Sequence, residues 1–378
     1  MILLADFAAL VAGAGILQGL FGLSLVRRFR QEHPSATPPS RPAISVLKPL
    51  HGAEPMLEQA LTTLCRQEYG PFQIVFGVQN RHDPAIAVVR RLEARFPHID
   101  IVLVINTTSH GRNRKVGNLI NMLPAARYDV LVIADSDVHT APDYLARLAD
   151  TLAQPGIGLV TTLYSGLPAT GTLAGTLGAT AITHGFLPGA LMARALGRQD
   201  CLGATMALRR STLEAVGGLG ALVSHLADDH VLGELVVAGG WRIGLAETIP
   251  ATTVPEVDLG ALYRHELRWS RTILALAPLG LALSTIQYPL VWAMLAVVLS
   301  GGAEWSLALL SAVWVERAVV GRLIDRMLDL TRHGLASRAP IWLLPLRDLM
   351  SIAVVLASYT SDEVEWRGEV LRTSLIKP

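Results

Sequence analysis

The chain has 378 residues and a formal net charge of +1, and 51% of its residues are hydrophobic while 17% are charged. Its mean hydropathy of +0.42 is too high for an ordinary soluble enzyme, so part of the chain is expected in or against a membrane. The near-zero net charge makes nucleic acid a poor candidate partner. Two cysteines, Cys65 and Cys201, fit a reducing compartment without a disulfide framework.

The first apolar run covers residues 2–26 and contains one charged residue, Asp6, near its start. A helix needs about 20 apolar residues to cross a bilayer, so this run is long enough. It is followed at once by Arg27, Arg28 and Arg30. A signal peptide carries its positive charge before the apolar run, and positive charge after a span favours the cytoplasmic side. We therefore predict a retained membrane anchor at residues 1–30; a buried core helix is the alternative.

A second apolar region follows toward the C-terminal end of the chain. We assign residues 271–362 to transmembrane and interfacial helices and residues 363–378 to a C-terminal tail. Within the apolar region, residues 283–300 and 305–324 are each long enough to span a bilayer.

Two pieces of this region are predicted to lie at the membrane surface. Residues 341–359 are interrupted by Arg347 and Asp348. Charges at membrane depth are costly and usually face protein or water, which favours a re-entrant or interfacial segment. Residues 270–282 contain Pro278 and suit an interfacial helix better than a span.

Between these apolar regions, a Pro/Ser-rich linker is expected at residues 31–42. Beyond it, strand-like apolar runs alternate with helical patterns. The expected strands are 43–48, 72–78, 100–105, 128–134 and 156–163, and the expected helices are 54–66, 84–96, 115–123 and 142–153. This alternation predicts an α/β fold in which a mostly parallel sheet has helices on both faces. We place the domain at residues 43–270.

Polar residues follow these strands, at the sheet edge where ligands bind in parallel α/β folds. They are Lys48 after the first strand, Gln79, Asn80 and Asp83 after the second, Asn106 after the third, and Asp135 and Asp137 after the fourth. No Gly-x-Gly-x-x-Gly follows the first strand, and the chain has no phosphate-binding loop of the Gly-x₄-Gly-Lys-Ser/Thr type. A nicotinamide-binding domain and a P-loop NTPase are therefore both disfavoured.

The stretch "VLVIADSDVH" ends a buried-looking strand with two carboxylates, Asp135 and Asp137. Like charges that lie close together raise each other's pKa, so a positive charge is expected beside them. A hard divalent cation fits, because it takes oxygen ligands and leaves positions for phosphate oxygens. An ordinary turn leading to a helix cap is the alternative.

Six segments surround this motif in a specific order: "ISVLKPLHGAEPMLEQAL", "VQNRHDPAIAVVRRL", "NRKVGNLINMLPAARYDVLVIADSD", "CLGATMALRRSTLEAVGGL", "LADDHVLGELVVAGGWRIGL" and "RHELRWSRTILALAP". Over residues 44–278 the chain resembles the ceramide glucosyltransferases and, more closely, the related bacterial hopanoid-biosynthesis glycosyltransferases. The resemblance implies a GT-A nucleotide-diphosphosugar transferase fold, Mn²⁺ or Mg²⁺, and inversion at the anomeric carbon. It implies Asp137 as the principal metal ligand, with Asp135 beside it meeting the ribose or donor sugar.

The same resemblance implies further donor-binding residues. Lys48 and the Val-Gln-Asn segment lie where the family seats the nucleotide base and ribose. Asn80 replaces the family's aspartate and brings no charge, which leaves the role of the neighbouring Asp83 open. Lys115 would meet the donor phosphate or ribose, or else be a solvated lysine. His184 lies near a family histidine of the donor or acceptor pocket, or is a structural histidine.

Asp229, in "LADDHV", matches the family's catalytic aspartate. Inverting transfer needs one base that takes the proton of the acceptor hydroxyl. Burial near an apolar acceptor raises the pKa of an aspartate toward a useful value, and Asp228 beside it adds like-charge repulsion. The alternative is a helix whose first turn carries acids because anions suit that position.

The segment "HELRW" resembles the family's Q/R-x-x-R-W signature except at its first position, where His265 stands. Arg268 would neutralise the negative charge that grows on the departing nucleotide diphosphate. Trp269 would form an aromatic wall for the donor sugar or the acceptor. Interfacial anchoring is the alternative for an Arg-Trp pair beside a membrane.

Together, these features predict a membrane-anchored inverting glycosyltransferase that moves one hexose from a UDP-sugar to a lipid hydroxyl. The preferred acceptor is a hopanoid polyol, and the preferred sugar is N-acetylglucosamine, followed by glucose. A ceramide-type acceptor is the nearest rival, and Asn80 and His265 also allow a non-catalytic lipid- or nucleotide-binding protein. The expected location is the cell inner membrane, multi-pass, with the catalytic domain in the cytoplasm where UDP-sugars are made.

Overall fold

The computed structural model describes residues 1–31, 41–328, 340–361, 363–366 and 369–372. These residues form two compact units. The sheet unit comprises the described residues within Glu32–Ala169 and Leu196–Pro255, and the helical unit those within Met1–Gln31, Thr170–Ala195 and Glu256–Lys377. Most of the predicted linker at 31–42 and half of the predicted tail at 363–378 lie outside the described residues. The division of the chain into an anchor, a catalytic domain at 43–270 and later membrane helices stays a prediction.

The main sheet of the sheet unit has seven strands in the order β3-β2-β1-β4-β8-β6-β9. Their bounds are β1 Ile44–Pro49, β2 Phe72–Val78, β3 Asp100–Ile105, β4 Val130–Ala134, β6 Ile157–Thr161, β8 Thr205–Arg209 and β9 Arg242–Leu245. Strands β1 to β4 pair in parallel, as does β6 with β9, whereas β8 runs antiparallel to β4 and β6. The predicted α/β fold with a mostly parallel sheet is confirmed.

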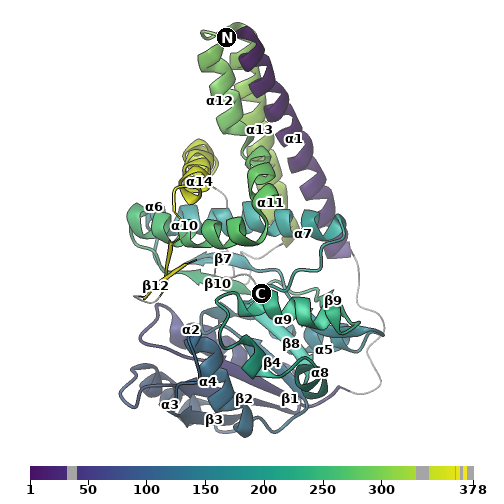
Figure 1. The fold of residues 1–378 in the computed structure, drawn as a ribbon, viewed down its shortest axis with the longest axis vertical. Helices are drawn as coiled ribbons and strands as arrows, with labels where there is room; N and C mark the ends of the chain where they lie inside the picture. Colours follow the sequence, from purple (N-terminus) through teal and green to yellow (C-terminus); the bar gives the residue numbers. More distant parts are fainter. Residues whose placement is uncertain (32–40, 329–339, 362, 367–368, 373–378) are drawn as a thin grey trace. The chain divides into compact units, whose positions relative to one another are not determined.

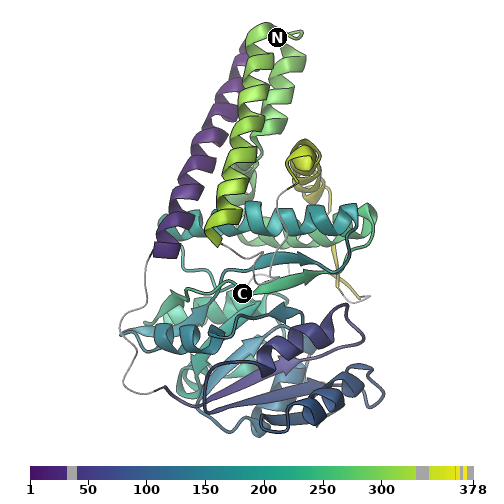
Figure 2. The ribbon, with the colours of Figure 1, turned by 180° about the vertical axis from the view of Figure 1, so that it is seen from behind.

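Helices cover both faces of this sheet (Figures 1 and 2). Successive strand residues point to opposite faces, so that Val46 and Leu47, both fully buried, belong to two different apolar cores. One core contains α2 Leu57–Cys65, α3 Ala85–Arg95 and α5 Tyr144–Leu152; the other contains α4 Arg114–Met122, α8 Arg210–Ala215 and α9 Asp228–Ala238. The 3₁₀ turns Leu123–Ala125 and Leu219–Leu222 complete the helices of this unit.

A second, three-stranded sheet in the order β5-β10-β7 was not predicted. Its strands are β5 Val138–His139, β7 Ser165–Pro168 and β10 Ala251–Val254. Strand β10 runs antiparallel to β5 and pairs Thr252 with Val138, the residue after Asp137. The small sheet therefore braces the turn that carries the two aspartates.

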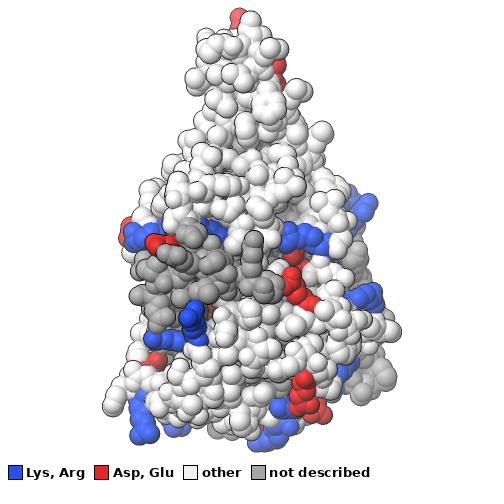
Figure 3. Space-filling view, in the orientation of Figure 1, with Lys and Arg blue, Asp and Glu red and all other residues white. Residues whose placement is uncertain are grey.

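The helical unit contains the long helices α1 Ile2–Gln31, α12 Pro289–Leu299 and α13 Glu304–Leu328, which pack along one another (Figures 1 and 2). Its other elements are α6 Leu173–Thr180, the π-helical turn Ala181–Phe186, α7 Leu187–Ala195, α10 Leu259–Leu276, α11 Pro278–Leu283, the 3₁₀ turns Ser284–Gln287 and Ile341–Leu343, α14 Leu344–Ser358, and the antiparallel pair β11 Glu363–Trp366 and β12 Glu369–Arg372. On the face drawn in Figure 3, the surface over α1, α12 and α13 is almost free of charged residues, whereas Lys and Arg side chains gather near α7 and α10.

Among the described residues, two helical stretches, Ile2–Arg30 and Ile341–Ser358, are long and apolar enough to cross a membrane. The N-terminal stretch agrees with the predicted anchor. The stretch at 341–358 was predicted to be re-entrant or interfacial, but its length and composition are those of a span. Its two charged residues, Arg347 and Asp348, are buried and each is paired with another side chain of the protein. Pairing removes the argument against a span, because a partnered charge faces protein rather than lipid.

Residues 283–300, predicted to be long enough to span a bilayer, do not form one straight helix. The helical pieces Pro278–Gln287 and Pro289–Leu299 meet at an angle of 71°, so together they form either one broken span or a re-entrant loop. Proline ends a helix because it lacks a backbone N–H and clashes with the preceding turn, and Pro289 begins the second piece. Residues 305–324 lie within the single helix α13, which is not among the candidate spans of the described chain.

Candidate active site

Lys48 lies beneath the turn that carries Asp135 and Asp137. It belongs to β1, next to β4, and is completely buried. Its ammonium group donates hydrogen bonds to the backbone oxygens of Asp135 and of Val138, the latter at 3.3 Å. Burial lowers the pKa of Lys48 to about 8, and the carboxylates of Asp137 and Asp135 oppose that shift. Lys48 therefore holds the backbone of the aspartate turn by hydrogen bonds from the protein interior. Its contact with a nucleotide stays a prediction.

Asp137 is half-buried and accepts a hydrogen bond from the Thr252 hydroxyl of β10. Burial, followed by repulsion from Asp135, raises the pKa of Asp137 to about 6. The middle residue of the turn, Ser136, donates its hydroxyl to the carboxylate of Glu54. Glu54 was not predicted as a site residue, although it follows the end of β1 at the same sheet edge. This edge thus brings the acids Glu54, Asp135 and Asp137 close together.

Lys115 connects the aspartate turn to the start of α9. Its Nζ lies 2.7 Å from Asp135 Oδ1 and 3.8 Å from Asp228 Oδ2. The N-cap residue of α4, Asn113, supports this arrangement, since its side chain accepts from Val116 N and donates to Asp228 Oδ1 at 3.2 Å. Burial disfavours the charged form of Lys115, but Asp135 and Asp228 outweigh it and hold its pKa above the ordinary value. The alternative of a solvated lysine does not hold, because its side chain is only 16% exposed.

Asp229 is the second residue of α9, and its Oδ1 accepts from the backbone N–H of His230 at 2.8 Å. Burial, followed by repulsion from Asp228, raises the pKa of Asp229 to about 6. The backbone at Gly203 passes so close that an added Cβ would lie 2.7 Å from Asp229 Oδ2. This close approach accounts for glycine at position 203 and limits where the Asp229 carboxylate can move.

Tyr164 is a site residue that sequence reasoning missed. It follows β6, and burial together with the carboxylates of Asp229, Asp135 and Asp137 raises the pKa of its phenol. The phenol therefore lies within the electrostatic reach of all three acids. Tyr164 comes just after a strand, at the sheet edge where the other polar residues lie. That position could have identified it from the sequence.

Asn80, predicted near the nucleotide base and ribose, and Asp83, a predicted donor-binding residue whose role was left open, both bind backbone amides. The buried Asp83 carboxylate accepts from Gly52 N at 3.0 Å and from Ala85 N at 2.9 Å. Asn80 is exposed, and its Oδ1 accepts from His82 N at 2.9 Å. Asp83 thereby ties the loop after β1 to the start of α3. Whether either residue contacts a nucleotide stays a prediction.

The oxygen atoms at the aspartate turn suit a hard divalent cation. Lys115 takes one oxygen of Asp135 and Thr252 takes one oxygen of Asp137, which leaves a second oxygen on each carboxylate. Within the part of the chain that the structure describes, no three His, Cys, Asp or Glu side chains converge as a metal cluster. A cation here would therefore need oxygens from a bound diphosphate or water to complete its coordination.

The segment "HELRW" lies on α10 in the helical unit. The rings of His265 and Trp269, one helical turn apart, meet edge to face with centroids 4.5 Å apart. Nδ1 of His265 bonds to the carboxylate of Glu256, a residue that sequence reasoning missed. Trp269 is 37% exposed and thus available to a ligand. Arg268 lies between them on the same helix.

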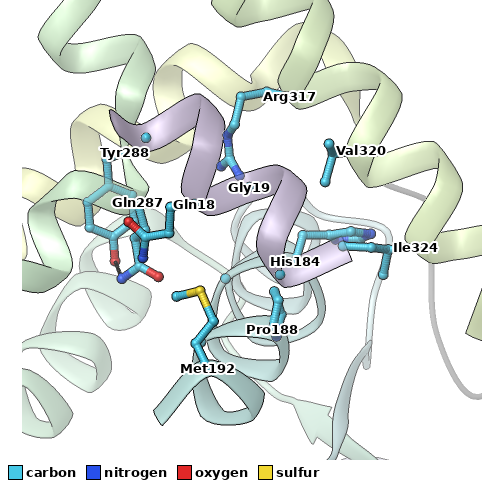
Figure 4. Close-up of a pocket in the computed structure, with 14 residues that line it drawn as sticks. Gln18, Gly19, His184, Pro188, Met192, Gln287, Tyr288, Arg317, Val320 and Ile324 are labelled. Atoms are coloured by element: carbon cyan, nitrogen blue, oxygen red, sulfur yellow. Dashed lines mark hydrogen bonds between the residues drawn. The ribbon is translucent and has the colours of Figure 1, made fainter. Parts of the chain in front are cut away.

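His184 belongs to the π-helical turn of the helical unit and lines a small cavity of about 50 Å³ (Figure 4). Its Nε2 bonds to Asp325 Oδ1 at 2.8 Å. The cavity lies among α1, α7 and α13 and includes Gln18, Gln287 and Arg317 in its lining. The predicted site residues thus fall into two sets. The sheet unit holds Lys48, Asn80, Asp83, Lys115, Asp135, Asp137 and Asp229, and the helical unit holds His184, His265, Arg268 and Trp269.

Two ceramide glucosyltransferases are among the known proteins whose sequences resemble this chain. The chain is 25% identical to ceramide glucosyltransferase 1 of Caenorhabditis elegans over 267 residues, which are 68% of this chain and 56% of that protein. It is 21% identical to ceramide glucosyltransferase 3 of the same organism over 91% of this chain and 75% of that one. The matched region thus spans about half the length of the first relative.

A solved structure shares the fold. The mannosyltransferase PcManGT of Pyrobaculum calidifontis, in complex with GDP-Man and Mn²⁺, superimposes with a TM-score of 0.54 at 19% identity, covering 94% of this chain and 99% of that one. The sheet unit therefore has the GT-A-like fold that the sequence predicted. The family model of glycosyl transferase family 21 matches residues 7–375, nearly the whole chain. The chain belongs to glycosyl transferase family 21.

Proposed function

We propose that the protein transfers one hexose from a UDP-sugar to a hydroxyl group of a membrane lipid, with inversion at the anomeric carbon. The observation that carries this proposal is the ammonium group of Lys115. It contacts Asp135 of the aspartate turn and approaches Asp228, the neighbour of Asp229. A donor-binding turn and a base are thereby held in one polar site at the carboxyl edge of the sheet, where α/β folds bind ligands.

Asp229 is the proposed general base. As the acceptor oxygen forms its bond to the anomeric carbon, Asp229 takes the hydroxyl proton, and the bond from that carbon to the diphosphate oxygen breaks. A pKa of about 6 leaves Asp229 ionised at neutral pH yet more basic than an ordinary aspartate. Gly203 and the N–H of His230 fix the position of its carboxylate.

Asp135 and Asp137 are the proposed ligands of Mn²⁺ or Mg²⁺, which would neutralise charge on the donor diphosphate when bound. Thr252 and Lys115 hold the two carboxylates by a hydrogen bond and an ion pair, and Lys48 binds the backbone oxygen of Asp135. The raised pKa of Asp137 supports this assignment, because a buried acid beside another acid is stabilised when a cation arrives.

The residues of α10 would act on the leaving group and the acceptor. Arg268 is proposed to stabilise the charge on the departing UDP, and Trp269 to pack against the sugar or the lipid. His265 is bonded to Glu256 and packed on Trp269, so it is proposed to hold the tryptophan ring in place. His184 stays a proposed donor- or acceptor-pocket residue.

Two classes of lipid are candidate acceptors. A hopanoid polyol with N-acetylglucosamine as the preferred sugar, and glucose next, is the first candidate. A ceramide-type lipid is the second, and it is favoured by the names of the relatives from C. elegans. The apolar helical unit supports a lipid acceptor of either kind over a water-soluble one.

A direct assay tests the proposed function. Purified full-length protein is incubated with UDP-N-acetylglucosamine or UDP-glucose, with Mn²⁺ or Mg²⁺, and with a hopanoid polyol or a ceramide in lipid vesicles. We expect release of UDP together with a glycolipid of matching mass. No UDP release at any metal concentration would support a non-catalytic binding protein and overturn the proposal.

We further propose that the protein is a multi-pass protein of the cell inner membrane with its sheet unit in the cytoplasm. Arg28 and Arg30 lie in the last turn of α1, and positive charge beside a span favours the cytoplasmic side. Donor supply requires this orientation, because UDP-sugars are made in the cytoplasm. A reporter enzyme fused after Arg30 tests it, and activity of a reporter that works only in the periplasm would reverse the assignment.

A further inference from the structure

Arg347 is a buried charged residue of the candidate span in α14, with a side chain only 4% exposed. Its guanidinium donates two hydrogen bonds to Glu266 of α10, at 2.7 Å to Oε1 and 2.6 Å to Oε2. It also donates to Leu177 O of α6 at 3.4 Å and to Ser351 Oγ at 2.9 Å. One side chain therefore joins three helices of the helical unit.

The partner of Arg347 lies inside the "HELRW" segment. Leu262, Glu266 and Ser270 recur every four residues and form the buried face of α10, whereas His265 and Trp269 form an adjacent face. Any rotation of α10 about its axis that moves Glu266 also moves His265 and Trp269. The bond to Glu266 thus controls the direction in which the neighbouring residues point.

Apolar packing alone does not determine this rotation. Leu262 packs with Ala174 and Leu177 of α6 and with Met350 of α14, but apolar burial is non-directional. A guanidinium–carboxylate pair with two parallel hydrogen bonds has a defined geometry. A buried charge at membrane depth is costly, and such residues usually have a functional reason to be there.

We propose that Arg347 is a positioning residue, which sets the rotation of α10 and thereby the placement of Arg268 and Trp269 for sugar transfer. This inference rests on the proposed function. It assigns α14 a part in the transfer reaction in addition to membrane attachment.

Arg347→Lys tests the inference, because lysine keeps the positive charge beside Glu266 but cannot form the two-pronged bond. The matched control is Asp348→Asn, one residue further along α14. Asp348 is equally buried and accepts from Arg317 of α13 at 2.7 Å, so its pair joins other helices than α10. Both variants are measured as full-length protein per folded molecule, for kcat, for KM of donor and acceptor, and for hydrogen exchange of α10.

We expect Arg347→Lys to lower kcat about tenfold to a hundredfold, as misplacement by an ångström does, with donor KM unchanged and faster exchange in α10. Asp348→Asn should change neither kcat nor the hydrogen exchange of α10. Glu266→Gln should reproduce the loss, and adding it to Arg347→Lys should cause no further fall, since the two residues act as one unit. Should Arg347→Lys fail to fold, Glu266→Gln alone provides the same measurements.

Two results would overturn the inference: unchanged α10 exchange in the Arg347→Lys variant, or a fall in kcat no greater than that of the Asp348→Asn control. A wild-type protein that transfers no sugar would instead overturn the proposed function. The exchange measurement separates the two cases, because it reports on α10 without requiring turnover.

Discussion

The two units of this protein place their charged residues in opposite ways. In the sheet unit, acids gather at one edge, and burial together with repulsion from a neighbouring acid raises the pKa values of Asp137 and Asp229 to about 6. In the helical unit, three ion pairs connect buried side chains, although the buried carboxylate oxygens of Glu316 have no hydrogen-bond partner among the described residues. These pairs are Arg347 with Glu266, Arg317 with Asp348, and His184 with Asp325.

This difference separates two uses of buried charge. In a pair, each buried charge is compensated by its partner, and the pair connects two helices. Clustered acids repel one another and are stabilised by a ligand that brings positive charge. Clustered acids therefore mark the proposed site of chemistry, and ion pairs between helices mark the supporting architecture. Each prediction below tests one side of this contrast.

The largest effect is expected at the aspartate turn. Asp137→Ala removes the proposed principal metal ligand and should abolish sugar transfer, by about a thousandfold or more if the metal supplies several kcal/mol of charge stabilisation. Wild-type activity should vanish in excess chelator and return with Mn²⁺ or Mg²⁺. The check is turnover against metal concentration, with Glu68→Ala, at an exposed residue after α2, as the control. Full activity in excess chelator would contradict the metal assignment.

The next effect concerns the base. Asp229→Asn keeps the shape of the side chain but cannot accept a proton, so kcat should fall about a hundredfold or more. Donor KM should change little, because the aspartate turn is intact. Steady-state kinetics with donor and acceptor varied separately provide the measurement. A variant that keeps wild-type kcat, or loses donor affinity instead, would place the base elsewhere.

The pH profile of the wild-type enzyme is a smaller and independent test. Only ionised Asp229 accepts a proton, and its pKa is raised to about 6 by burial and Asp228. At saturating metal and donor, kcat should therefore be constant above about pH 7 and fall about tenfold per pH unit below 6. A rate that stays constant down to pH 4.5 would mean that the base has an ordinary aspartate pKa.

Much of the sheet unit was predictable from the sequence because its signals are local. Strands β2 and β3 agree with the predicted 72–78 and 100–105, since each is a short apolar run bounded by polar or turn-forming residues. The D-x-D turn was found because strand ends meet at one edge of a parallel sheet, whereas Lys115 was found through the family resemblance. The contact between Lys115 and Asp135 follows from that topology.

Other features were not predictable, because they depend on pairing between distant residues. Strand β10 braces Asp137 through Thr252, which lies 115 positions away in the chain. In the sequence, Arg347 interrupts an apolar run and argues against a span. The structure shows that its charge is paired with Glu266. The bend before Pro289 was missed because an apolar run read by composition alone does not reveal a break.

The last prediction concerns stability and compares the two units directly. Asp348→Asn leaves Arg317 buried beside a neutral amide, and breaking a buried pair costs about 3 kcal/mol or more. The thermal unfolding midpoint should fall, whereas activity per folded molecule should stay near the wild-type value.

Asp229→Asn should instead lower activity per folded molecule and leave the thermal unfolding midpoint near the wild-type value. Because the folded-state pKa of Asp229 is raised above its ordinary value of 3.8, its stability contribution is present below about pH 4 and lost as the pH rises through about 6. At pH 7 the ionised form destabilises the fold, so the neutral amide should not lower the midpoint. Equal losses of stability in both variants would show that the acids of the sheet unit are paired like those of the helical unit, and the contrast between clustered and paired charges would fail.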